Sequence, residues 1–197
     1  SFRATTLAEL EDGLAERHVI LSSEERRRRI KAGVEACAAE AGGVARIDDG
    51  LLQEVTHIVE WPVAILGSFE AELLELPEQA IVTPMRVHQR YFPVEKDGQL
   101  LPNFVVVAGT ATHDPAVVAH NNARVLRARL ADARFFFEAD LQKPLESFLP
   151  SLEKRIWLAK LGSVRDKVTR LVSLVDRMGG DADAQRTALL CKADLAT

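Results

Sequence analysis

The stretch from His88 to Gly109, "HQRYFPVEKDGQLLPNFVVVAG", constrains the fold more than any other part of the sequence. Two apolar runs flank Asp97-Gly98, a dipeptide that favours a two-residue hairpin turn because both residues tolerate positive φ. We therefore predict a β-hairpin over residues 91–107. Each strand carries a proline, Pro93 or Pro102, which cannot donate a backbone hydrogen bond.

A two-residue turn makes residues whose numbers sum to 195 face each other, so Pro93 is expected opposite Pro102 at a non-hydrogen-bonded position. At that level neither strand could donate to a further neighbour, and the hairpin would be locally edge-like on both sides. Such a hairpin could present side chains to a partner without recruiting a neighbouring backbone. A three-residue loop from Lys96 to Gly98, with a bulge at Gly98, is the competing register.

The residues before the hairpin alternate helix and strand signals. Ser22 with Glu25 forms a capping box, and Gly42 ends the helix that follows. A later helix should bend or split at Thr83-Pro84, because proline removes one backbone donor and crowds the preceding turn. The predicted elements are helices at 6–18, 22–41, 49–60 and 70–90, and strands at 19–21 and 63–69.

After residue 113 the pattern becomes almost entirely helical. Asp114 is placed as the N-cap and Pro115 as the first residue of a long helix over 115–139. Further helices are predicted at 145–162, 163–180 and 183–196, with Ser163 as a cap. We therefore predict an α+β fold, with a mixed helix and strand domain at 1–110 and a helical bundle at 111–197.

The long helix carries a row of arginines. At 100° per residue, Arg124, Arg127 and Arg134 cluster opposite the apolar face. Arg129 is predicted to project toward the apolar side, near Phe136. A buried guanidinium needs a partner, so Arg129 should pair with a carboxylate, such as that of Asp132, or reach a ligand.

The net charge of −4 is unevenly distributed. Residues 1–110 hold 11 Lys+Arg and 18 Asp+Glu, whereas residues 111–197 hold 14 and 11. A polyanion would therefore meet the second part. The run Arg26–Arg29 is surrounded by glutamates and is interpreted as a solvated helix face. Cys37 and Cys191 are interpreted as reduced structural thiols.

Motifs for stand-alone chemistry are missing from the sequence, which has no phosphate-binding GxxxxGK[ST], dinucleotide fingerprint, nucleophile elbow or HExxH. His113-Asp114 suggests a histidine–aspartate metal site, but only His120 follows as a further ligand. We therefore expect neither a catalytic residue nor a metal site. A binding or scaffold role fits best. We expect the protein in the cytoplasm, because neither a signal peptide nor a membrane-spanning run is present.

Four stretches, in order, carry a resemblance to a known family: "LLQEVTHIVEWPVAILGSFEAELLELPEQAI", "HQRYFPVEKDGQLLPNFVVVAG", "RVLRARLADARFFFEADLQKPLESFLPSLEKRIWLAKLGSVRDKVTRL" and "LLCKADLAT". Together they resemble the beta subunit of the bacterial tetrameric (alpha2beta2) glycyl-tRNA synthetase. The resemblance implies an internal fragment whose second part begins an HD-like helical domain. It implies that catalysis resides in the alpha subunit, where ATP and Mg are used, and that this fragment alone is inactive and needs no cofactor.

The expected partners are then the alpha subunit and tRNA(Gly), and the expected contribution is tRNA binding and subunit assembly. Combined with the charge pattern, this gives candidates for a tRNA or interdomain contact: Gln89, Arg90, Tyr91, Arg124, Arg127, Arg129, Arg134, Arg165 and Lys167. Two alternatives stay open, namely a purely structural assembly module without tRNA contact and an HD-type metal phosphohydrolase.

Overall fold

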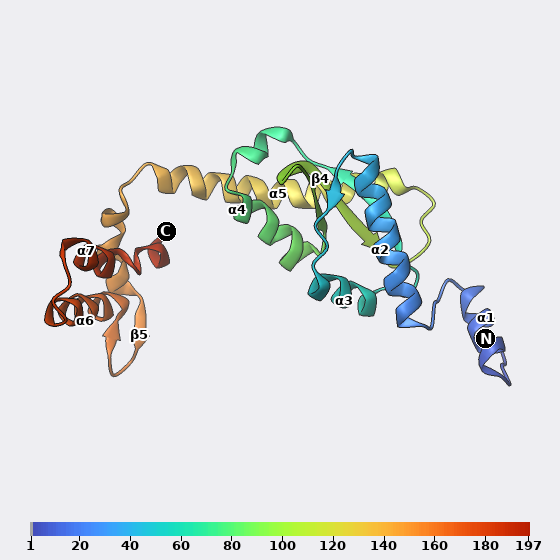
Figure 1. Ribbon diagram of the computed structural model, residues 1–197, viewed down its shortest axis with the longest axis horizontal. Coiled ribbons are helices and arrows are strands. Elements are labelled where there is room, and N and C mark those ends of the chain that lie inside the picture. Colours follow the sequence, from blue (N-terminus) through green and yellow to red (C-terminus); the bar gives the residue numbers. More distant parts are fainter. Residues whose placement is uncertain (1) are drawn as a thin grey trace. The chain divides into compact units, whose positions relative to one another are not determined.

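The computed structural model describes residues 2–197 and confirms the α+β class. The chain divides into two compact units, one up to Arg134 and one spanning Phe135–Thr197, each described by itself (Figure 1). This division falls within helix α5 (Pro115–Leu141). The boundary predicted at residues 110 and 111 follows a change in composition, and its significance as a domain boundary stays a prediction.

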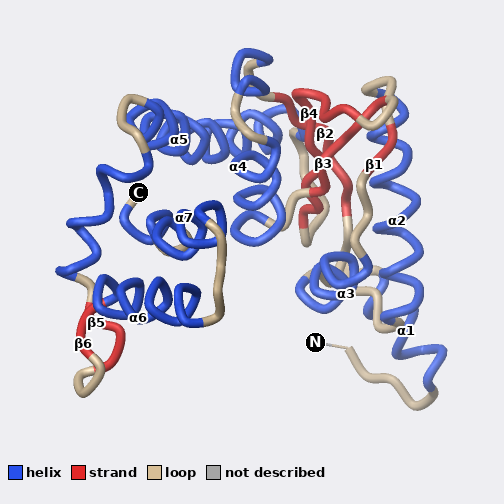
Figure 2. The backbone as a smooth tube through the Cα atoms, turned by 60° about the vertical axis from the view of Figure 1, so that its left-hand side comes forward, coloured by secondary structure: helices blue, strands red, loops and turns tan. Residues whose placement is uncertain are grey.

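A four-stranded antiparallel sheet organises the first unit. Its strands are β1 (Val44–Ala45), β2 (Val63–Ser68), β3 (Phe92–Lys96) and β4 (Gln99–Ala108), in the order β1-β3-β4-β2. The predicted hairpin, β3–β4, is therefore the centre of the sheet. Helices α2 (Ser23–Glu40) and α3 (Asp49–Ile58) cover one face (Figure 2), where their apolar side chains pack against Phe92, Val94 and Val105.

The turn of the hairpin forms as predicted, but the proline register is wrong. Asp97 and Gly98 both have positive φ, at 51° and 78°, and Lys96 pairs with Gln99. Farther out the register shifts, so Pro93 pairs with Phe104 instead of Pro102. Turn geometry fixes only the pairs near the turn. A bulge then absorbs additional β4 residues and lets Phe104 and Val105 fill the core on opposite faces.

The expectation that the hairpin is edge-like on both sides is also wrong. Its strands have neighbours, because β1 pairs with β3 and β2 pairs with β4. The prolines contribute their carbonyl groups: Pro93 accepts from the Arg46 N–H at 2.9 Å, and Pro102 accepts from the Phe69 N–H at 3.0 Å. Each proline stands at the end of the segment that pairs with the neighbouring strand, so the sheet needs no backbone N–H donor at that position.

The helices of the first unit begin where capping chemistry predicts, with small shifts. The Ser22 hydroxyl accepts from the Glu25 N–H at 3.2 Å, and α1 covers Leu7–Ala15. Asp48, not Asp49, caps α3. The predicted strand at 19–21 does not form, because this segment's backbone bonds to Glu60 and to the Arg26 side chain instead of to a strand.

The predicted helix over 70–90 is divided, as expected, at Thr83-Pro84. It consists of a 3-10 helix η1 (Ala71–Glu75), α4 (Glu78–Thr83) and a π-helical segment η2 (Pro84–Gln89). Since Pro84 provides no N–H, the regular helical hydrogen-bond pattern cannot continue through it.

Helix α5 starts as predicted. The Asp114 carboxylate accepts from the N–H groups of Ala116 and Val117 at 3.0 and 3.1 Å. Its fully buried residues are Ala123, Leu126 and Leu130. Arg129 is exposed, so its predicted orientation toward the apolar side is wrong. The buried stripe is narrower than expected, and Arg129 lies about a quarter turn away from it.

The second unit has its own small core, formed by Leu149, Leu152, Val164, Val168 and Ala193. Ser163 and Asp166 form a reciprocal capping box at the start of α6. The prediction of a helix over 145–162 is wrong after Lys154. A 3-10 helix that contains Pro150 ends there, and a β-hairpin follows it. The elements are η3 (Leu145–Lys154), β5 (Ile156–Leu158), β6 (Gly162–Ser163), α6 (Val164–Arg177), α7 (Ala182–Leu190) and η4 (Ala193–Ala196).

Candidate functional site

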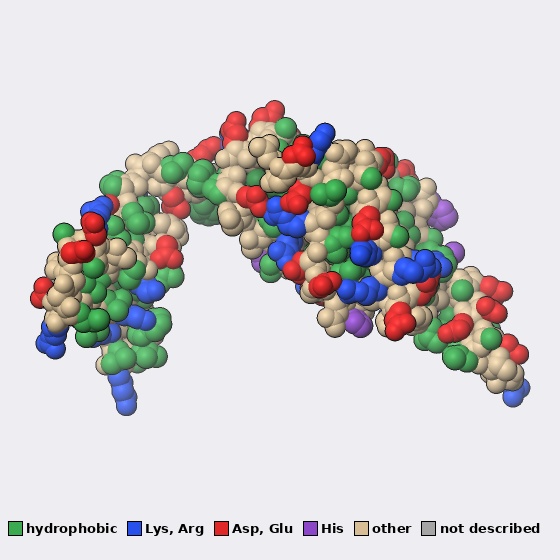
Figure 3. All heavy atoms as spheres, viewed as in Figure 1, with side chains coloured by type: hydrophobic (Ala, Val, Ile, Leu, Met, Phe, Trp, Pro, Cys, Tyr) green, Lys and Arg blue, Asp and Glu red, His purple; other side chains and the backbone are tan. Residues whose placement is uncertain are grey.

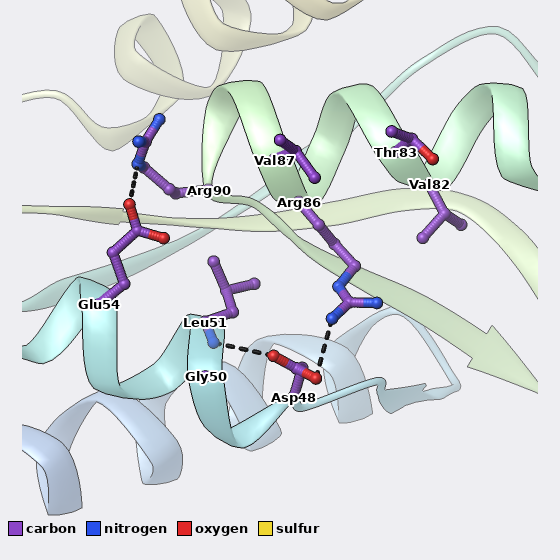
Figure 4. Close-up of a pocket in the computed structure, with 9 residues that line it drawn as sticks. All are labelled: Asp48, Gly50, Leu51, Glu54, Val82, Thr83, Arg86, Val87 and Arg90. Atoms are coloured by element: carbon purple, nitrogen blue, oxygen red, sulfur yellow. Dashed lines mark hydrogen bonds and ion pairs between the residues drawn. The ribbon is translucent and has the colours of Figure 1, made fainter.

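A groove of about 540 Å³ lies at the root of the central hairpin, between α3 and the segment formed by α4 and η2 (Figure 4). Its polar side chains come from both sides. They are Asp48, Glu54, Thr83, Arg86 and Arg90. Leu51, Val82 and Val87 supply apolar surface, so the groove combines charged groups with a hydrophobic floor.

Local backbone geometry places the two arginines. Pro84 starts the π-helical turn that carries Arg86, and Arg90 ends it in the left-handed conformation, with φ 57° and ψ 38°. The Tyr91 N–H then donates to the Met85 carbonyl at 2.8 Å. A left-handed non-glycine residue costs about 1 kcal/mol, and both π-turns and such strained residues are enriched at functional sites.

Each arginine of the groove is paired with a carboxylate on α3 or its cap. Arg86 Nη2 lies 2.9 Å from Asp48 Oδ2, and Arg90 Nε donates to Glu54 Oε1 at 2.7 Å. The Leu51 N–H, and then Arg86, hold the pKa of Asp48 below its usual range. An anionic ligand would therefore compete with two carboxylates for the guanidinium groups.

One donor of a groove residue is unpaired. The Nε of Arg86 is buried and has no hydrogen-bond partner among residues 2–197. Sequence reasoning did not nominate Arg86. The available signal was its spacing, four residues before Arg90 and just after the helix-splitting Pro84.

Tyr91 and Gln89, two of the predicted contact residues, lie beside the groove. Tyr91 is 2% exposed, its ring stacks on Phe104 at 4.6 Å, and its hydroxyl donates to Asn122 Oδ1 at 2.7 Å. Burial raises the pKa of Tyr91 to about 12, so it remains a protonated donor at neutral pH. Tyr91 therefore anchors the hairpin to α5, while Gln89 is half-buried at the end of η2.

The predicted arginines of α5 fall into two pairs. Arg124 and Arg129 are exposed. Arg127 Nε donates to Glu70 Oε1 at 2.5 Å, and Arg134 Nη2 lies 4.0 Å from Glu75 Oε2. Carboxylates at the two ends of η1 therefore lie near one pair, and the other pair projects into solvent.

The two candidates on α6 belong to the second unit. Lys167 Nζ lies 3.3 Å from the centroid of the Trp157 ring, a cation–π contact. One terminal nitrogen of Arg165 is buried without a hydrogen-bond partner in the described chain. Whether any predicted contact residue meets tRNA stays a prediction.

Metal-binding and membrane-spanning features were also sought in the part of the chain that the structure describes. No three His, Cys, Asp or Glu side chains gather there in a way that could hold a metal ion. None of the helices described is both long enough and apolar enough to cross a bilayer.

Comparison with known proteins gives one consistent family. The family model described as glycyl-tRNA synthetase beta subunit matches residues 1–197. Similar curated proteins are the glycine–tRNA ligase beta subunits of Shewanella oneidensis, Shewanella sp. strain ANA-3 and Psychromonas ingrahamii, which are 48%, 48% and 45% identical over 185 residues. Each alignment covers 91% of this chain but only 27% of the relative's length.

Proposed function

Because the chain belongs to the glycyl-tRNA synthetase beta subunit family, we propose that it contributes tRNA binding and subunit assembly to an enzyme that charges tRNA(Gly) with glycine. The chemical steps, with ATP and Mg²⁺, would take place on the alpha subunit, in the cytoplasm. The observation that carries this proposal is the family match over the whole chain, together with identities near 48%.

Exposed cations support the tRNA part of the proposal. Arg124 and Arg129 project into solvent from α5. Accessible cations such as these suit phosphate recognition, because each phosphate contact by a Lys or Arg side chain releases a condensed counterion. Among the predicted contact residues of the first unit, these two are therefore the strongest candidates for phosphate contacts.

A specific observation favours a second candidate, a purely structural assembly role, for other arginines. Arg90 is already paired with Glu54, and Arg127 is already paired with Glu70. Both pairs join segments far apart in the sequence. Exposed pairs of this kind contribute little to stability, but they fix the geometry between the elements they connect.

The test uses the complete beta subunit assembled with the alpha subunit. Two double variants are compared, Arg124→Ala/Arg129→Ala and Arg90→Ala/Arg127→Ala, with Lys96→Ala at the exposed hairpin turn as a matched control. Binding of tRNA(Gly) is measured at several salt concentrations, and assembly is measured by gel filtration.

Loss of Arg124 and Arg129 should weaken tRNA binding and make the slope of log affinity against log salt shallower by about two. Loss of Arg90 and Arg127 should mainly lower thermal stability or assembly. Unchanged tRNA affinity in both double variants, with weakened assembly, would favour the structural role. If the unmodified assembled enzyme does not bind or charge tRNA(Gly), the proposed function is wrong.

A further inference from the structure

The β5–β6 hairpin of the second unit exposes an unusual amount of apolar surface for so short an element. Ile156 is 77% exposed, Trp157 45%, Leu158 54% and Leu161 50%. Successive side chains of a strand point to opposite faces, so β5 exposes apolar groups on both of its faces. Exposed apolar groups concentrated in this way mark a binding surface more often than an ordinary solvated loop.

The hairpin is held both at its base and at its turn. The Val164 N–H donates to the Arg155 carbonyl at 2.7 Å, and Arg170 Nη1 donates to the Leu161 carbonyl at 2.9 Å. Gly162 has a φ of 83°, and a Cβ there would lie 2.3 Å from the Asp166 carboxylate. These contacts fix the hairpin against the start of α6, so its exposed side chains sit on an ordered support.

Trp157 is oriented by a cation. Lys167 Nζ lies 3.3 Å from the centre of the Trp157 ring, so the lysine occupies one face of the indole. The ring is still 45% exposed. The indole therefore combines an accessible aromatic surface with an adjacent positive charge, which is the combination that stacks a nucleobase and contacts its phosphate.

Positive charge is concentrated on the same segment. Residues 154–170 contain six Lys and Arg and one acidic residue, Asp166, whereas the rest of Phe135–Thr197 contains four basic and eight acidic residues. Lys154, Arg155 and Lys160 are exposed. Figure 3 shows hydrophobic and basic side chains side by side at the hairpin end of this unit.

We propose that the β5–β6 hairpin binds an unpaired segment of RNA, with Trp157 stacking on a base and the surrounding cations contacting phosphates. This inference rests on the proposed function, because the RNA available to the assembled enzyme is tRNA. Single-stranded RNA fits the surface better than a protein does, since the indole is supported by Lys167 and the same segment also carries the exposed Lys154, Arg155 and Lys160.

The first test uses the chain's two tryptophans, Trp61 and Trp157. Trp61→Phe leaves Trp157 as the only indole, and its fluorescence is followed while an unstructured RNA of about twelve nucleotides is added. Stacking should quench Trp157, and rising salt should reverse the quenching. A duplex of the same RNA should quench less, because its bases are already stacked. No quenching by the single strand at low salt would overturn the proposal.

The second test uses the complete beta subunit assembled with the alpha subunit. Trp157→Ala should weaken tRNA binding about tenfold, and Trp157→Phe, which keeps an aromatic ring, should restore most of the affinity. Met178→Ala is the matched control, because Met178 is 84% exposed in the same unit. Lys160→Ala should make the slope of log affinity against log salt shallower by about one, whereas Lys143→Ala should leave the slope unchanged.

The outcomes separate this inference from the proposed function. If the unmodified enzyme binds and charges tRNA while Trp157→Ala behaves like Met178→Ala, the hairpin proposal is overturned and the proposed function stands. If Trp157→Ala leaves RNA affinity unchanged but weakens association with the alpha subunit, the hairpin is a protein-docking element instead. If the unmodified enzyme binds no tRNA, the proposed function itself fails.

Discussion

The contact between Tyr91 and Asn122 should tie the central hairpin to α5. The tyrosine is 2% exposed, and its hydroxyl donates to Asn122 Oδ1 at 2.7 Å, while Asn122 Nδ2 donates to the Val118 carbonyl. A neutral intramolecular hydrogen bond contributes about 1 kcal/mol net. We therefore expect Tyr91→Phe to destabilise the first unit by about 1 kcal/mol. Asn122→Ala should cost somewhat more, because it also removes the bond to Val118.

The assay is a double-mutant cycle in urea. Trp157→Phe leaves Trp61, in the first unit, as the only tryptophan, so its fluorescence reports unfolding of that unit. The double variant should cost less than the sum of the single variants, with a coupling energy of about 1 kcal/mol. Asn121→Ala, an exposed neighbour on the same helix, should change the free energy of unfolding by less than about 0.5 kcal/mol.

A coupling energy below about 0.3 kcal/mol would mean that the two side chains act independently. The hydrogen bond would then not hold the hairpin against α5, and the association would have to come from apolar packing alone. Equal effects of Asn121→Ala and Asn122→Ala would refute the reasoning in another way, because replacing the partner of Tyr91 would then cost no more than replacing an exposed neighbour on the same helix.

Two further predictions concern the same sheet. Tyr91 is the only tyrosine, so ultraviolet absorbance should show a single phenol titrating near pH 12. Because burial raises the pKa of Tyr91 from 10, its contribution to stability should be complete below about pH 10 and lost as pH rises toward 12. Ordinary titration near pH 10 would contradict the burial of Tyr91. Gly67→Ala places a Cβ 2.3 Å from the Phe104 ring and should lower the free energy of unfolding, measured in urea, by about 1–3 kcal/mol. The control is Ser68→Ala at the exposed neighbouring position, and an equal loss in both variants would show that the Phe104 ring moves freely.

Features set by short-range chemistry could be predicted from the sequence. The Asp97-Gly98 turn, the caps at Ser22, Asp114 and Ser163 and the break at Pro84 all appear in the structure. Each depends on the φ range or hydrogen-bonding capacity of one or two residues, which the sequence states directly. The family resemblance is confirmed for the same chain.

Features that depend on distant neighbours could not be predicted. Pairing of Pro93 with Phe104 requires both faces of the sheet to be packed, and the partners of Arg90 and Arg127 lie 36 and 57 residues away. The apolar spacing over 156–163 is compatible with a helix or a strand, so the sequence predicts a helix where the structure has a hairpin. Arg86 was overlooked for a similar reason, since its carboxylate partner belongs to another element.

The central hairpin turn, most of the helix caps, the α+β class and the family could all be read from the sequence. The three-dimensional packing was needed to show which arginines pair with carboxylates, and to show that the proline-bearing hairpin is the centre of a sheet and not its edge. The difference arises from how far along the chain each interaction acts. Backbone preferences act within a few residues, whereas burial and ion pairing depend on which distant segments the packed core brings together.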